Sequence, residues 1–145
     1  MGGNSDLHNN IDAQLAINAV ALGATGAITG AIIDRQGYGG VEFVIGYGSV
    51  VTTGTVVTAL VKEGDVTGTL TSVADADLIG TEALAGVAAG ARASGTGKNV
   101  TKRLGYKGNK RYVQFSVVSA AVSVAVKVAA VALLHSPELA PQTNP

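Results

Sequence analysis

Apolar side chains recur at every second position along several segments, and this period of two constrains the fold more than any other feature. From Val41 to Tyr47 every second residue is valine, phenylalanine, isoleucine or tyrosine, and the even positions from Val122 to Val128 are all valine. Lys127 falls on the opposite side of the second segment. Because a β-strand points successive side chains to opposite faces, both segments are predicted to be strands with one buried face.

Turn-forming residues separate such segments about every ten residues, so the chain is predicted to contain about eight strands. Valine and threonine favour strands because their branched β-carbons restrict the first side-chain torsion, and the 20 glycines supply turns. The predicted strands cover residues 13–21, 27–34, 41–47, 55–63, 66–73, 100–106, 111–119 and 121–134, with a turn at Gly64-Asp65 and one helical turn within 82–88. This pattern is typical of an all-β antiparallel sandwich, jelly roll or barrel.

The two ends of the chain differ in composition from the strand-rich middle. Residues 1–10 are polar and glycine-rich and are predicted to be a flexible N-terminal arm, and residues 136–145 are a proline-bearing C-terminal tail. One β-sandwich domain is expected between them, at 11–135. Leu15 to Ile33 carries no charge, but polar residues and glycines interrupt it and no positively charged segment precedes it. We therefore interpret it as buried strands of a soluble protein, with no membrane partner.

Groups that could carry catalysis or hold a metal are scarce. His8 and His135 lie in the arm and at the start of the tail, where a general base would be poorly positioned. The glycine-rich stretch 94–99 lacks residues that a phosphate-binding loop requires, and the stretch from Asp75 lacks two ligands of a calcium loop. The sequence therefore predicts a protein that is not an enzyme and that holds no cofactor and no metal.

One stretch concentrates positive charge, since six of the ten basic residues lie between Lys98 and Arg111. Its centre, GYKGNKRYVQF (105–115), is predicted to form a β-hairpin. The turn is expected at Gly108-Asn109, flanked by Lys107, Lys110 and Arg111, with Tyr106 and Tyr112 as cross-strand partners. Three interpretations stay open: a solvated hairpin tip, a surface that recognises another protein, or a nucleic-acid site in which the tyrosines stack on bases.

Several of these stretches resemble a known family. GYKGNKRYVQF, followed by a β-rich run and VALLHSPELAP (131–141), is similar to segments of small proteins encoded beside the major capsid protein of tailed bacteriophages. GYGGVEFVIGYGSV (37–50) and DADLIGTEAL (75–84) resemble the same family, so the similarity covers about residues 11–141. In particular, the chain resembles the capsid cement (decoration) proteins of the short-tailed Bordetella phage type.

The resemblance implies a jelly-roll-like β-sandwich that binds the outer surface of an icosahedral capsid as a homodimer. It implies a structural role in the virion, after assembly in the host cytoplasm: the protein would clamp adjacent subunits of the major capsid protein against the pressure of packaged DNA. The alternative is a nucleic-acid-binding β-module that uses the basic segment 98–111. A receptor- or carbohydrate-binding sandwich ranks last, because the aromatic residues that such sites stack on are few.

The family supplies no motif for the contact residues, so we predict them from this sequence alone. Mobile arms and a charged loop tip are the parts of a compact domain that can reach a neighbouring subunit. The predicted contacts lie in the arm, the basic hairpin and the tail: Asn4, His8, Asn9, Asn10, Lys107, Lys110, Arg111, Leu139 and Pro141.

Overall fold

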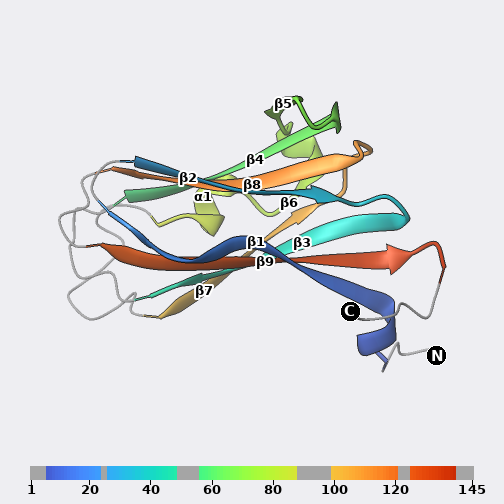
Figure 1. Cartoon of the computed structure of the whole chain (residues 1–145), viewed down its shortest axis with the longest axis horizontal. Helices are drawn as coiled ribbons and strands as arrows, with labels where there is room; N and C mark the ends of the chain where they lie inside the picture. Colours follow the sequence, from blue (N-terminus) through green and yellow to red (C-terminus); the bar gives the residue numbers. More distant parts are fainter. Residues whose placement is uncertain (1–5, 24–25, 49–55, 88–98, 121–124, 140–145) are drawn as a thin grey trace.

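The computed structural model describes residues 6–23, 26–48, 56–87, 99–120 and 125–139, and the statements below concern these ranges. They form nine strands in two facing sheets, together with two 3-10 turns and one short helix (Figure 1). In chain order the elements are η1 (His8–Asn10), β1 (Ile11–Leu22), β2 (Gly26–Asp34), β3 (Tyr38–Tyr47), β4 (Val56–Val66), β5 (Thr69–Ser72), η2 (Asp75–Asp77), β6 (Leu78–Ile79), α1 (Glu82–Ala85), β7 (Val100–Tyr106), β8 (Tyr112–Ala120) and β9 (Val126–Pro137).

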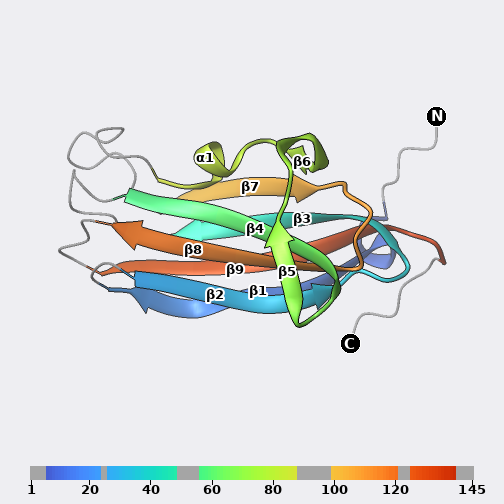
Figure 2. The ribbon, with the colours of Figure 1, turned by 90° about the horizontal axis from the view of Figure 1, so that it is seen from above.

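The strand order is that of a jelly roll. The first sheet runs β1-β9-β3-β7-β6 and the second runs β2-β8-β4-β5, and every pairing is antiparallel. Most successive strands alternate between the sheets, so the chain wraps around the core, as in a double-sheet jelly roll. In Figure 2 the strands β2, β8 and β4 run along the molecule and β5 crosses in front of them, and the strand order places β5 at the edge of this sheet. The predicted all-β, antiparallel, jelly-roll-like sandwich is confirmed.

Alternation within the strands builds the core. Val41, Phe43, Ile45 and Tyr47 of β3 are all buried, as the period of two predicted. Phe43 stacks on Phe115 of the facing sheet, with ring centroids 5.3 Å apart. In β9, the described part of the valine-rich segment, Val126 and Val128 are buried and Lys127 is exposed, again as predicted.

The predicted basic hairpin is wrong. Tyr106 ends β7 in the first sheet, where it lies opposite Val41, whereas Tyr112 begins β8 in the second sheet, opposite Asp34. Residues 107–111 therefore cross from one sheet to the other, and the two tyrosines are not cross-strand partners. A glycine-asparagine pair suits a hairpin and a between-sheet connection equally well, so the local sequence did not distinguish them.

Two further details differ from the prediction. The pair Gly64-Asp65 is a bulge inside β4 and not a turn, because the register with β5 shifts between Glu63 and Val66. A Cβ on Gly64 would lie 2.5 Å from the Thr69 carbonyl oxygen, so this close approach requires glycine. The segment after β5, where no strand was predicted, contains the short strand β6 beside β7. These two features account for the ninth strand and for the longer β4.

The described residues of the uncharged segment 15–33 are only partly buried, which corrects the interpretation of this segment as buried strands. It forms most of β1 and β2, and each of these is the edge strand of its own sheet. Leu15 is 55% exposed, and Val20 and Ile32 are each 38% exposed. Among the described residues, no helix has the length and apolar character that would let it cross a membrane.

Candidate interaction surface at one end of the sandwich

Segments that are far apart in the sequence meet at one end of the sandwich. The tail lies there because β9 pairs with β3 up to Tyr38 opposite Pro137, and η1 lies there because β1 begins with Ile11 opposite His135. The turn between β2 and β3 and the connection 107–111 are at the same end, at the right in Figures 1 and 2. We call this region, made of residues 6–10, 35–38, 107–111 and 136–139, the tail end.

Arg35 holds the connection 107–111 in place. Its guanidinium donates hydrogen bonds to the carbonyl oxygens of Lys110, of Gly108 at 2.7 Å and of Tyr38 at 2.9 Å. It also lies over the ring of Tyr106, 5.5 Å from the centroid. The planar fork of an arginine can serve several carbonyls at once, which the single ammonium of a lysine does less well. One side chain thus fixes the β2–β3 turn to the crossing between the sheets.

Tyr106 also holds the connection 107–111 in place. Its buried hydroxyl donates a short hydrogen bond to the Glu63 carboxylate on β4 and accepts one from the backbone N–H of Lys110 at 3.1 Å. Burial, together with the hydrogen bond to Glu63, raises the pKa of Tyr106 well above its ordinary value. The first and second sheets are therefore joined at this end through one phenol.

The basic residues of the connection do not form a continuous cationic surface. Lys110 pairs with Asp65 at 2.6 Å and Arg111 pairs with Asp34 at 2.7 Å. On β7, Arg103 lies 3.9 Å from Glu42. Hydrogen bonds from Arg111 and Lys110 hold the pKa values of Asp34 and Asp65, respectively, below their usual range. Three of the five cations that the structure describes between 99 and 111 thus face carboxylates, which weakens the case for a phosphate-binding groove.

The described part of the predicted arm is locally ordered. Asp6 accepts hydrogen bonds from the side chain of Asn9 at 2.6 Å and, through its carbonyl oxygen, from the side chain of Asn10, also at 2.6 Å. The hydrogen bonds from Asn9 lower the pKa of Asp6. His8 is exposed within the same turn. Asn4, the fourth predicted contact of the arm, lies outside the described residues.

The tail adds an exposed apolar side chain to this end. The Glu138 N–H donates to the Gly37 carbonyl at 2.8 Å, which ties the tail to the β2–β3 turn. Leu139 follows and is 82% exposed, the most exposed large hydrophobic side chain of the described residues. Pro141 lies outside the described ranges. A cleft of about 260 Å³ separates the tail from the connection and is lined by Arg35, Gln36, Gly37, Tyr38, Asp65, Asn109, Arg111 and Glu138.

The structure therefore places the described predicted contacts His8, Asn9, Asn10, Lys107, Lys110, Arg111 and Leu139 in one region, the tail end. Sequence reasoning missed the residues that organise it, Arg35 and Glu63, because nothing in their local sequence indicates a partner more than forty positions away. Among the residues that the structure describes, no three histidine, aspartate or glutamate side chains gather as a metal site would require.

Comparison with known proteins gives a likeness in fold. No protein-family model and no curated protein sequence matches the chain. Among solved structures it is similar to a chain in the structure of the infectious bursal disease virus Gx strain, with a TM-score of 0.50 and 10% identity, over 90% of this chain and 33% of that one. A second match is the VP2 subviral particle of the same virus, with a TM-score of 0.34 and 14% identity, over 88% of this chain and 41% of the other.

This chain thus spans well under half the length of the chains that it matches. At 10% identity the first likeness establishes the fold alone. It agrees with the jelly-roll strand order, which was assigned from the pairing of the strands.

Proposed function

We propose that the protein is a non-enzymatic structural component of a bacteriophage head, a cement protein that binds the outer surface of the icosahedral capsid. It would clamp adjacent subunits of the major capsid protein and would act as a homodimer on the shell. The observation that carries the proposal is the jelly-roll strand order over the whole described chain, an architecture that viral capsid domains use. The sequence resemblance to phage decoration proteins supplies the specific role.

The tail end supports the proposal because it combines features of a protein-binding surface. Lys107 and Arg111 are exposed, and Lys110 and Arg111 lie beside the carboxylates of Asp65 and Asp34, so this end offers both signs of charge to a protein partner. Leu139 offers an apolar anchor beside them. Arg35 and Tyr106 hold the connection rigid, which reduces the entropy lost on binding. A shell that displays many copies of one subunit would bind many copies of this protein and be stabilised by mass action.

Co-sedimentation tests the role directly. The purified chain is mixed with mature heads that lack their own surface proteins, at about 150 mM salt, and pelleted. We expect saturable pelleting at a fixed ratio to the major capsid protein. No pelleting at any concentration would reject the cement role. Pelleting that depends steeply on salt and that free DNA abolishes would favour the nucleic-acid alternative instead, since neutralised phosphates release counterions.

A triple variant tests whether the connection makes the contact. Lys107, Lys110 and Arg111 are replaced by alanine, which removes three positive charges, two of them on exposed residues and one on a half-buried residue, and leaves the backbone carbonyls that Arg35 binds. We expect weaker pelleting with an unchanged unfolding midpoint. The matched control replaces Lys62, Lys102 and Lys127, which lie on the sheets, and should pellet as the wild type does. Equal binding by both variants would exclude the connection from the interface.

A further inference from the structure

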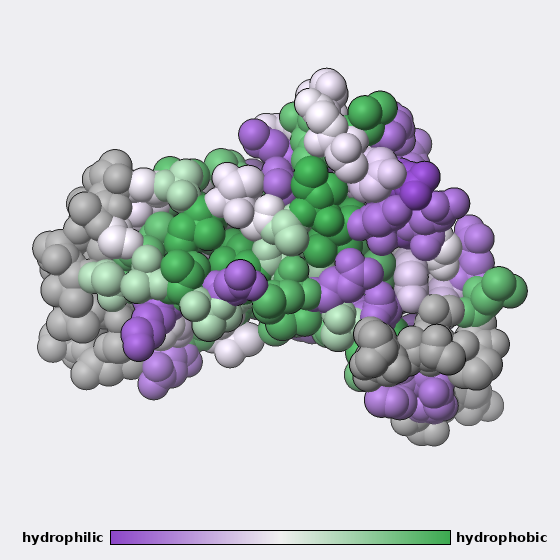
Figure 3. Space-filling view, in the orientation of Figure 1, coloured by the Kyte–Doolittle hydropathy of each residue, from purple (hydrophilic) through white to green (hydrophobic). Residues whose placement is uncertain are grey.

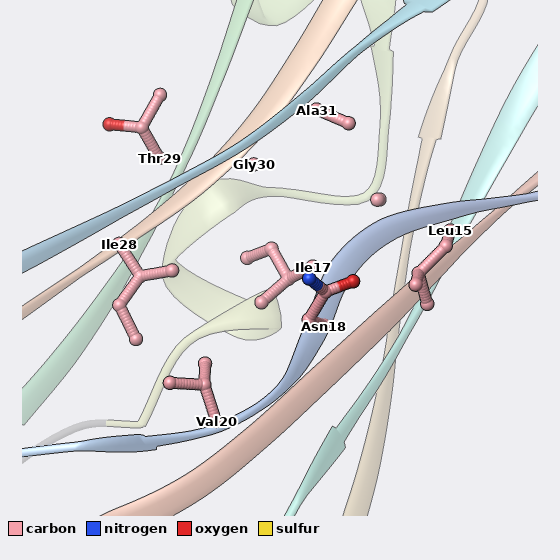
Figure 4. A pocket seen from close by; sticks show the side chains of 9 residues that line it. Leu15, Ile17, Asn18, Val20, Ile28, Thr29, Gly30 and Ala31 are labelled. Carbon is pink, nitrogen blue, oxygen red and sulfur yellow. The ribbon is translucent and has the colours of Figure 1, made fainter.

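A groove runs along the open edge of the sandwich, between β1 and β2. It has a volume of about 260 Å³ and its lining is mostly aliphatic. Figure 4 shows Ile17 and Val20 projecting from β1 and Ile28 projecting from β2 into the space between the two strands, with Asn18 beside them. The side chain of Thr29 points away from this space. The groove is therefore a concave apolar slot with one amide at its rim.

The groove exists because both edge strands are irregular at this point. The register of β1 against β9 shifts twice between Leu15 and Val20, and that of β2 against β8 shifts between Thr29 and Ile32. At Gly30 the strands approach each other closely, since a Cβ there would lie 2.5 Å from the Ala16 carbonyl oxygen. A bulge re-aims side chains and bends the strand, so these shifts turn apolar residues outward on either side of the Gly30 contact.

The part of the edge that forms the groove carries no charge. No ionisable residue occurs from position 13 to position 33, and the charges of the two strands, Asp12 and Asp34, lie at the start of β1 and at the end of β2. The middle of both strands therefore lacks the edge charges that usually prevent pairing with other chains. In Figure 3 apolar side chains cover the middle of this face, where β1 and β2 lie. The apolar surface continues onto the outer face of the first sheet, because Leu15 lies opposite Val131, which lies opposite Val44. A contiguous exposed apolar surface is a feature of interaction sites.

The shape of the groove favours an extended segment as the binding partner over a second copy of this chain. An isologous dimer centred here would place one concave groove against an identical groove and leave space unfilled. An extended segment is narrow enough to lie along the groove. It presents every second side chain on one face, so aliphatic residues at alternate positions would enter the groove. Charged residues in that segment would lose their hydration without finding a partner, so the segment must be uncharged.

We propose that the β1/β2 groove binds an extended, uncharged, aliphatic segment of the shell subunit. The inference rests on the proposed function and supplies what a clamp requires, a second contact surface besides the tail end. Bulges interrupt both edge ladders, so the affinity comes mainly from side chains inserted beside Val20 and Ile28, and less from a continuous ladder of backbone hydrogen bonds.

A matched pair of substitutions at Asn18 tests the groove. Asn18→Glu places a charge at the rim, whereas Asn18→Gln keeps an amide of the same length, and both change an exposed side chain. Ala27→Glu, on β2 but outside the groove, controls for the added charge. In co-sedimentation with stripped heads we expect Asn18→Glu to raise the half-saturation concentration about tenfold or more. Asn18→Gln and Ala27→Glu should stay within about twofold of the wild type.

The outcomes separate the two proposals. If the wild type pellets and all three variants pellet equally well, the groove inference fails and the cement role stands. If the wild type does not pellet, both fail. A photo-crosslinking residue at position 18 gives an independent readout on shell-bound protein. Attachment to an uncharged aliphatic segment of the shell subunit supports the inference, and attachment to a second copy of this chain, or to a charged loop, overturns it.

Discussion

Two side chains hold the connection 107–111 of the tail end. Arg35 donates to three carbonyl oxygens, and the Tyr106 hydroxyl donates to Glu63 and accepts from the Lys110 N–H. These side-chain bonds add to two backbone hydrogen bonds at the ends of the connection, from the Lys107 N–H to the Asp77 carbonyl at 2.9 Å and from the Arg35 N–H to the Arg111 carbonyl at 3.0 Å. A buried polar group left without its partner costs more than the bond contributes, so these residues are expected to be sensitive to substitution.

Replacing Tyr106 with phenylalanine should destabilise the protein by about 1–3 kcal/mol. The ring and its packing remain, but the Glu63 carboxylate and the Lys110 N–H each lose a partner inside the fold. Tyr112→Phe is the control, because no hydrogen bond from its hydroxyl to another described residue is present, and it should change stability by less than about 0.5 kcal/mol. Urea denaturation measures both. Equal effects would mean that the hydrogen bonds of the Tyr106 hydroxyl contribute no measurable stability.

At the scale of the elements, the sequence predicts the strands well and their pairing poorly. The segment 100–106 forms a strand with those bounds, and the face of β3 from Val41 to Tyr47 is buried as expected. Alternation is a local property, so it is readable in the sequence. Whether 107–111 closes a hairpin or crosses between sheets depends on residues in other strands, such as Arg35 and Glu63. The same reason explains why the partly exposed edge strands β1 and β2 were interpreted as buried.

Gly30 lies where β2 approaches β1, and we expect a larger residue at this position to be poorly tolerated. A Cβ there would lie 2.3 Å from the Phe115 carbonyl oxygen and 2.5 Å from that of Ala16, and both are backbone atoms that cannot rotate away. Gly30→Ala should therefore destabilise the protein by about 3 kcal/mol or more. Gly23→Ala is the control, since nothing lies within 4 Å of its added Cβ. It should change stability by no more than about 1 kcal/mol. If Gly30→Ala were as stable as Gly23→Ala, the close approach of β1 to β2 would be wrong.

At the scale of the whole molecule, the candidate site follows from topology. The arm, the connection and the tail were each predicted from exposure and composition, and the jelly-roll order brings their described parts to one end. The β1/β2 groove arises in the same way, since those two strands are edges of different sheets and meet only in the folded chain. Residues that contact a partner can be guessed from the sequence one by one, but the surface that they form depends on the order of the strands.

Global stability should fall in alkaline solution, because two tyrosines are buried near opposite ends of the sandwich. Tyr47 donates to the Ala85 carbonyl at 3.0 Å, and burial raises its pKa far above the ordinary value of 10.0, as it does for Tyr106. Above about pH 10 both ionise in the unfolded chain while both stay protonated in the folded one. The unfolded state then binds fewer protons, so each tyrosine lowers the free energy of unfolding by about 1.4 kcal/mol per pH unit.

The test compares the wild type with Tyr47→Phe from about pH 8 to pH 11, by denaturant unfolding at each pH. We expect the variant to lose stability less steeply above pH 10, by about the 1.4 kcal/mol per unit that one tyrosine contributes. Between about pH 8 and 9 tyrosine is protonated in the folded and in the unfolded state. The free energies of unfolding of the two proteins should therefore change with pH in parallel in this range, which provides an internal control. Parallel curves up to pH 11 would show that Tyr47 ionises as readily in the folded protein as in the unfolded chain. That result would contradict the burial of the Tyr47 side chain, whose hydroxyl reaches from the end of β3 to α1.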